Sequence, residues 1–123
     1  MRFLVLATLL LLTSCEAAPL SMSIEQKGGA LVVEVFTKWW LGVRSNDTPC
    51  VHDVELVRDG RVLWRMSVQP DRQCADLRSF VIGRAPKGFG DEGPLASPLA
   101  PGDYTLSASG IGEGKRDFKV PLH

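Results

Sequence analysis

The 123-residue sequence contains few of the residues on which enzymatic and metal chemistry depend. It has only two histidines, His52 and His123, and three cysteines, so a zinc site would find few candidate ligands close together. It contains no G-x-S-x-G segment, no glycine-rich loop between a strand and a helix, and no D-x-D-x-D-G run typical of a calcium loop. We therefore expect no catalytic residues, no metal site and no small-molecule cofactor.

An excess of charge of either sign is also missing. Fourteen Lys and Arg residues balance fourteen Asp and Glu residues, which gives a formal net charge of zero. Nucleic-acid-binding domains usually carry a clustered excess of basic residues. Hydrophobic residues make up 45% of the chain, which is typical of a folded protein and too high for a disordered one. The composition indicates a small folded domain that does not bind nucleic acid.

Long helical periods are scarce as well, and strand patterns take their place. After residue 15 no stretch keeps a helical period over three turns, and 12 glycines and 8 prolines interrupt the chain. Segments that alternate, or that are rich in β-branched and aromatic residues, predict seven strands: Ser21–Gln26, Leu31–Lys38, Val51–Arg58, Val62–Val68, Leu77–Gly83, Tyr104–Ser109 and Lys115–Val120. We predict an all-β fold, a single antiparallel β-sandwich.

The central pair of predicted strands forms a hairpin, and its register can be argued from residue types. A two-residue loop at Asp59-Gly60 pairs Trp64 with Glu55. A three-residue loop that begins at Arg58 pairs Trp64 with Val54 instead. Because an aromatic–β-branched pair contributes about 0.2–1 kcal/mol, we predict the three-residue loop and a core position for Trp64.

The longest apolar run lies at the N-terminus. Phe3–Leu12 follows Arg2 and is interrupted only by Thr8. A helix needs about 20 residues to cross the hydrocarbon core, whereas a basic start followed by a run of this length is typical of a secretory signal. The end of the run, Leu12-Thr13-Ser14-Cys15, resembles the lipobox of bacterial lipoproteins.

This resemblance implies that lipid is attached to Cys15 and that the chain is cut just before it. Residues 1–14 are then a signal peptide, residues 15–20 a short tether, and residues 21–123 the folded domain. The absence of Asp after Cys15 favours the outer membrane, so we expect a lipid-anchored protein of the bacterial cell envelope that faces the periplasm. The alternative is an ordinary signal peptide cut near Ala17 or Ala18.

The cysteine count agrees with lipidation and predicts a disulfide. Three cysteines leave an unpaired one in an exported chain. If Cys15 carries lipid, Cys50 and Cys74 remain, and in an oxidising compartment they are expected to form a bridge that closes a loop of 25 residues, 50–74. A metal site and a redox pair are the alternatives, but the first needs more nearby ligands and the second is usually spaced C-x-x-C.

A second resemblance lies in the last third of the chain. The segment Leu99–Tyr104 reads L-x-P-G-x-Y and precedes an alternating strand. It resembles the tyrosine corner of immunoglobulin-like and fibronectin type III sandwiches, in which the Tyr hydroxyl binds the backbone upstream. The placement of Cys50 and Cys74 departs from the disulfide of antibody domains. The resemblance therefore implies an immunoglobulin-like sandwich of about seven strands, not an antibody-type domain.

Two segments are candidate contact surfaces for a partner. Trp39 and Trp40 are adjacent, so one of them would point outward if the segment is a strand; the alternative is that both are packed. Residues 83–102 are predicted to lack regular structure, and Arg84, Lys87 and Phe89 lie at the start of this loop. The loop could also be a passive crossover between the sheets.

The function predicted from these features is a non-catalytic binding or structural domain. It would be held at the membrane through the lipid on Cys15 and would contact another protein of the envelope. The alternative function is a small inhibitor of a lysozyme or protease that acts through the 83–102 loop.

Overall fold

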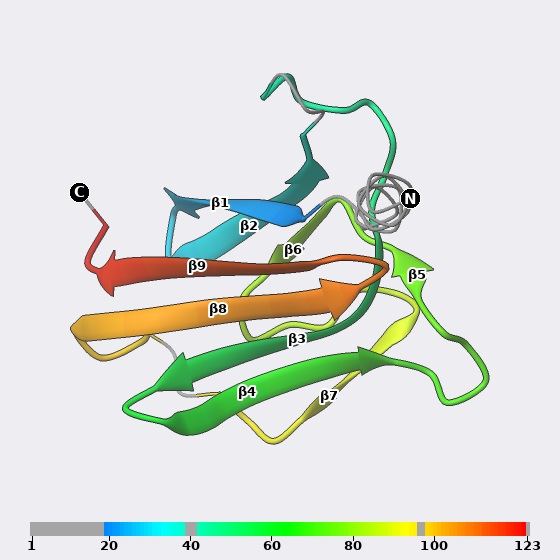
Figure 1. The fold of residues 1–123 in the computed structure, drawn as a ribbon. Coiled ribbons are helices and arrows are strands. Elements are labelled where there is room, and N and C mark those ends of the chain that lie inside the picture. Colours follow the sequence, from blue (N-terminus) through cyan, green and yellow to red (C-terminus); the bar gives the residue numbers. More distant parts are fainter. Residues whose placement is uncertain (1–18, 39–41, 96–97, 123) are drawn as a thin grey trace, which may run out of the picture.

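The computed structural model describes residues 19–38, 42–95 and 98–122. Within these ranges the chain is all-β and forms two antiparallel sheets that pack face to face (Figure 1). The strands are β1 (Leu20–Lys27), β2 (Ala30–Thr37), β3 (Cys50–Arg58), β4 (Arg61–Val68), β5 (Ala75–Asp76), β6 (Ser79–Val81), β7 (Phe89–Glu92), β8 (Gly102–Gly110) and β9 (Glu113–Val120). The predicted β-sandwich is confirmed.

The order of the strands is that of an immunoglobulin-like sandwich. One sheet has the order β1-β2-β6, and the other has the order β7-β4-β3-β8-β9, with β5 paired to β3. In immunoglobulin-like folds the first two strands of the chain likewise share a sheet with a later strand, while the hairpin-linked middle and final strands form the opposite sheet.

The core lies between the sheets and is built from alternate residues of each strand. In β3, Val54 and Leu56 are fully buried, whereas Glu55 between them points to the outer face. Trp64 of β4 is 1% exposed, and its ring stacks at 6.2 Å from the ring of Phe80 in β6. This aromatic pair joins the two sheets, so Trp64 occupies the core as predicted.

The structure contains two strands that were not predicted and shortens a third. The predicted strand Leu77–Gly83 reduces to β6, Ser79–Val81. The short strand β5 precedes it, and β7 lies inside the 83–102 segment, so the prediction that this segment lacks regular structure is wrong. β7 forms because β4 has a free edge: Phe89 pairs with Val68, and its side chain enters the core.

The register of the β3–β4 hairpin also differs from the prediction. The loop has two residues, Asp59 and Gly60, both with positive φ (52° and 75°), which is the type I′ geometry that matches strand twist. Pairing starts with Arg58 opposite Arg61 and then shifts by one residue, so that Leu56 rather than Val54 faces Trp64. The predicted three-residue loop is therefore wrong.

The shift is a β-bulge, and burial explains it. With a two-residue loop and uninterrupted pairing, Leu56 would share a face with Leu63, and Trp64 would point to the outer face with Glu55. One extra residue in β4, Leu63, moves Trp64 to the core side opposite Leu56 and places Arg65 opposite Glu55. The extra residue needed to bury Trp64 is thus inserted in the strand, not in the turn.

The tyrosine corner expected from the resemblance is present at the start of β8. Tyr104 is 3% exposed, and its hydroxyl donates to the carbonyl oxygen of Ala100 at 2.5 Å. Arg58 donates through Nη1 to the Tyr104 hydroxyl at 3.1 Å and through Nη2 to the carbonyl oxygen of Pro101 at 3.2 Å. These bonds join the segment before β8 to the end of β3. The Tyr104 ring also stacks on Phe118 of β9, with ring centroids 5.5 Å apart.

We expect Tyr104→Phe to lower the free energy of unfolding by about 1–2 kcal/mol, because the Ala100 carbonyl loses its donor and Arg58 loses an acceptor. Thr105→Val is the matched control, since the Thr105 hydroxyl bonds to Asp117 at an exposed position. Its removal should cost less than about 0.5 kcal/mol. Urea unfolding of both variants measures the difference, and equal losses would contradict a structural role for the corner.

The predicted disulfide is confirmed. Cys50 and Cys74 are bonded, with their Cα atoms 5.3 Å apart. Cys50 begins β3, and the bridge connects it to the segment that follows β4. The bond therefore closes the open end of the β3–β4 hairpin.

The sandwich has two distinct ends. At the first, which we call the tether end because the tether predicted from the sequence would precede it, β1 begins and Leu20 pairs with Thr37. The β8–β9 turn lies nearby, since a Cβ at Gly114 would overlap the Leu20 carbonyl. At the second, which we call the pocket end, the β1–β2 turn lies near the end of β9. The eight residues of β1 span about 25 Å between them.

Candidate functional site

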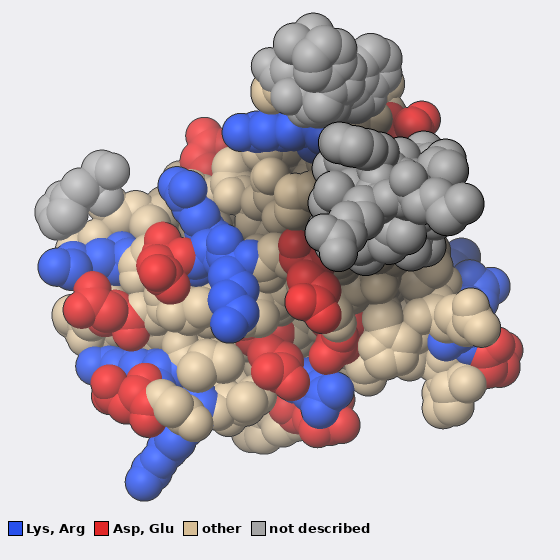
Figure 2. All heavy atoms as spheres, viewed as in Figure 1, with Lys and Arg blue, Asp and Glu red and all other residues tan. Residues whose placement is uncertain are grey.

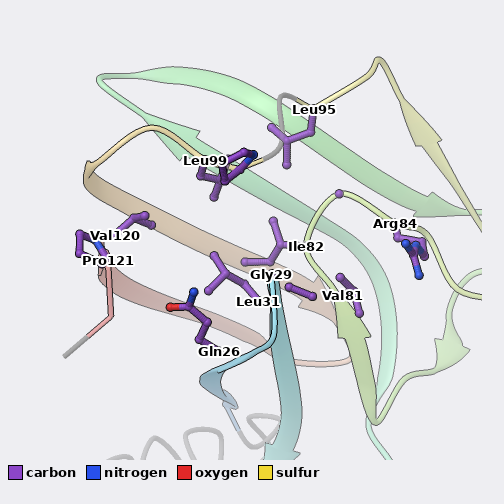
Figure 3. Close-up of a pocket in the computed structure, with 13 residues that line it drawn as sticks. Gln26, Gly29, Leu31, Val81, Ile82, Arg84, Leu95, Leu99, Val120 and Pro121 are labelled. Atoms are coloured by element: carbon purple, nitrogen blue, oxygen red, sulfur yellow. The ribbon is translucent and has the colours of Figure 1, made fainter.

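The candidate site is an open pocket of mixed polar and apolar lining between the two sheets, at the pocket end of the sandwich. Its volume is about 430 Å³, which lies within the range of pockets that bind ligands or partner side chains. Leu31, Ile82, Leu95, Leu99 and Val120 supply its apolar lining. Figure 3 shows these aliphatic side chains arranged around one space.

Residues far apart in the sequence build the walls of the pocket. Leu31 comes from the start of β2 and Val120 from the end of β9, so the opposite sheets supply one wall each. Ile82 follows β6 and is held by its backbone N–H, which donates to the Leu31 carbonyl at 3.0 Å. Leu95 and Leu99 belong to the segment between β7 and β8 and form the remaining wall.

Gly83 allows this last wall to approach. Its φ is +92°, a backbone conformation that favours glycine. A Cβ at this position would lie 3.2 Å from Leu95 Cδ2, closer than an ordinary van der Waals contact. The left-handed glycine therefore both ends the β6 segment and leaves room for Leu95 beside the pocket.

Two polar side chains lie on opposite sides of the pocket (Figure 3). Gln26 belongs to β1, and Arg84 follows Gly83; both are exposed. The Arg84 backbone N–H donates to the Val81 carbonyl at 3.0 Å, which fixes the turn that carries its side chain. Arg84 is the one charged residue among the described residues that line the pocket, so the lining offers a positive charge beside its aliphatic side chains.

The predicted contact residues do not form one cluster. Arg84 lines the pocket, and Lys87 is exposed on the turn before β7. Phe89 is 8% exposed and packs in the core, so its side chain is not available at the surface. Trp39, Trp40 and the predicted lipidation site Cys15 lie outside the described residues, as does the predicted signal peptide.

The pocket itself was missed by sequence reasoning. Its lining residues are aliphatic, and their types do not distinguish a pocket wall from a filled core. The sequence feature that points toward it is the pair of leucines, Leu95 and Leu99, in a proline-rich segment. Prolines disfavour a regular strand there, yet large apolar side chains still tend to be buried against other residues.

Ser109, Asp53 and His52 have the residue types used in acyl transfer, but they are arranged in the wrong order for it. The Ser109 hydroxyl donates to Asp53 Oδ1, and His52 Nδ1 lies 3.5 Å from the same oxygen. Arg65 donates to the other oxygen of Asp53 at 3.2 Å. A serine nucleophile needs the imidazole between the hydroxyl and the carboxylate. Here the carboxylate lies in the middle, so His52 is not placed to accept the Ser109 proton.

The remaining surface carries mixed charge. Figure 2 shows basic and acidic side chains interspersed on the side of the molecule that carries β8 and β9. Within the described ranges, no group of three or more His, Cys, Asp or Glu residues is arranged to hold a metal ion. Across the same part of the chain, no helix is long and apolar enough to cross a membrane.

Comparisons with known proteins return no relative: no protein-family model, no curated protein and no solved structure matches the chain.

Proposed function

We propose that the protein is a lipid-anchored protein of the bacterial cell envelope whose sandwich is a non-catalytic binding domain. The lipid on Cys15 would hold it at the membrane, and the pocket would receive side chains from another envelope protein. The observation that carries the proposal is the position of the pocket. It lies at the end of the sandwich opposite the start of β1, about 25 Å further from the tether.

The chemistry of the pocket indicates what kind of partner fits. Leu31, Ile82 and Leu95 are among the aliphatic side chains of its lining, and burial of a partner's apolar residues against them would favour association. Arg84 at the rim adds a positive charge that an acidic residue of the partner would complement. The preferred partner is therefore a protein segment with apolar residues next to an acidic one.

The anchoring part of the proposal is tested by the intact mass of the protein purified from membranes of its native host. We expect a chain that begins at Cys15, heavier by two or three acyl chains, because two or more chains are needed for stable anchoring. Reduction should add two hydrogens by opening the Cys50–Cys74 bridge. A chain without lipid that begins after Ala17 or Ala18 would contradict the anchoring.

The binding part is tested by site-specific photocrosslinking in the native host. A benzoylphenylalanine in place of Gln26, at the pocket rim, should give one discrete crosslinked product. The same group in place of Asp59, at the β3–β4 turn outside the pocket lining, should not give that product.

A variant that fills the pocket gives the decisive comparison. Leu31→Trp places a larger side chain in the pocket and should abolish the crosslink from position 26. Val62→Trp introduces the same residue at an exposed site outside the pocket lining and should leave the crosslink unchanged. Thermal unfolding of both variants verifies that they fold. A crosslink that persists in folded Leu31→Trp would refute the pocket as the binding site.

A further inference from the structure

The tether end of the sandwich would lie close to the membrane if the proposed lipidation is correct. Cys15 is five residues before Leu20, and five extended residues span at most about 18 Å. The start of β1, the end of β2 and the β8–β9 turn all lie at this end. These elements are therefore within reach of the lipid surface, while β1 carries the pocket end away from it.

Two exposed apolar side chains lie at the tether end. Ile111 is 71% exposed in the β8–β9 turn, and Val43 is 55% exposed just before the bridge that Arg44 forms with Lys38 at the end of β2. The Ile111 backbone N–H donates to the Cys50 carbonyl at 3.3 Å, which ties the turn to the disulfide-bonded start of β3. Ile111 thus projects from a backbone that is held in place.

Basic side chains accompany the apolar ones. Lys38 and Arg44 both lie against the Phe36 ring, at 5.8 Å and 4.1 Å from its centroid. Arg44 also pairs with Glu34, whereas Lys38 forms no ion pair with another described residue. The Lys38 ammonium group lies over the edge of an aromatic ring and has no carboxylate partner among the described residues, so it is suited to contact lipid phosphates.

We propose that the tether end is a membrane-contacting surface. Ile111 and Val43 enter the headgroup region of the bilayer, and Lys38 contacts the phosphates. The occupant is a phospholipid surface because the tether is too short to hold this end far from one. The inference rests on the proposed lipidation. It does not use the placement of Trp39 and Trp40, which lie between Lys38 and Arg44 in the sequence and outside the described residues.

The proposal is tested with the lipidated full-length protein in vesicles of phosphatidylethanolamine and phosphatidylglycerol. An environment-sensitive fluorophore is attached to Ile111→Cys or Val43→Cys. The matched control is Val62→Cys, which is 53% exposed in the native protein and lies near the β3–β4 turn at the pocket end. Because Cys50 and Cys74 are bonded and the Cys15 sulfur would be acylated, the introduced cysteine is the thiol that reacts.

Spin-labelled lipids should quench the probes at positions 111 and 43 at least about threefold more strongly than the probe at 62, since interfacial side chains enter about 5–10 Å into the headgroup region. Iodide in the buffer should show the reverse order. Equal quenching at all three positions on vesicle-bound, acylated protein would overturn the membrane contact alone. A mass without acyl chains, together with loss of vesicle binding, would overturn the proposed anchoring and this inference with it.

Discussion

Replacing Trp64 with alanine should lower the free energy of unfolding by about 3–5 kcal/mol, a cost typical of removing a large buried aromatic side chain. Trp64 is 1% exposed and stacks on Phe80 across the interface between the two sheets. Its indole N–H donates to the Asp91 carboxylate at 3.5 Å, so the substitution also removes a contact with β7. Urea unfolding of the variant measures the loss.

Leu63→Ala is the matched control, and it tests the β-bulge directly. Leu63 is 37% exposed because the register shift leaves it outside the regular pairing with β3. We expect its truncation to cost less than about 1 kcal/mol. Uninterrupted pairing from the two-residue turn would bury Leu63 and expose Trp64. A larger loss for Leu63→Ala than for Trp64→Ala would therefore show that the bulge is absent.

Removing the Cys50–Cys74 bridge should destabilise the domain by about 3.5 kcal/mol, the chain-entropy value for the loop of residues 50–74. The variant is Cys50→Ala with Cys74→Ala, compared with the oxidised protein by urea unfolding. This is a large part of the 5–15 kcal/mol that stabilises a typical domain. The fold should remain, because the core residues of both sheets are unchanged.

The reduced native protein provides the control for this prediction. It lacks the same constraint on the unfolded chain but keeps both sulfur atoms, so it should lose about the same stability as the double alanine variant. A loss below about 1 kcal/mol in both would contradict a stabilising role for the bridge. A loss confined to the alanine variant would assign the effect to packing of the sulfur atoms instead.

Much of the fold follows from local sequence patterns. Alternation in β3 is strong enough to place Val54 and Leu56 in the core, because a strand exposes successive side chains to opposite faces. The segment before Tyr104 predicts the corner that the structure contains, since its hydroxyl bond spans only four residues. The disulfide follows from cysteine number once Cys15 is assigned to lipid, and that assignment stays a prediction.

The candidate site could be predicted only in part. Arg84 was singled out from the sequence, and it lies at the pocket rim. The walls were not foreseen, because Leu31 and Leu95 come from parts of the chain 64 positions apart and meet only after the sheets have packed. The prolines and glycines of residues 83–102 predict an irregular segment with Phe89 at a contact surface. Phe89 is buried because β7 pairs with the edge of β4, opposite Val68, and this pairing turns the Phe89 side chain into the core.

The sequence by itself determined the β-strands with strong alternation and the tyrosine corner, because each depends on residues close together in the chain. It narrowed the disulfide to Cys50 and Cys74 only under the predicted lipidation of Cys15, and the structure shows that bond. Only the tertiary structure decided the position of the bulge at Leu63, the existence of β7 and the pocket between the sheets. All three depend on which side chains, far apart in the sequence, become buried against one another when the sheets pack. The bulge buries Trp64, β7 covers the edge of β4, and the pocket lies where Leu95 and Leu99 meet residues of both sheets.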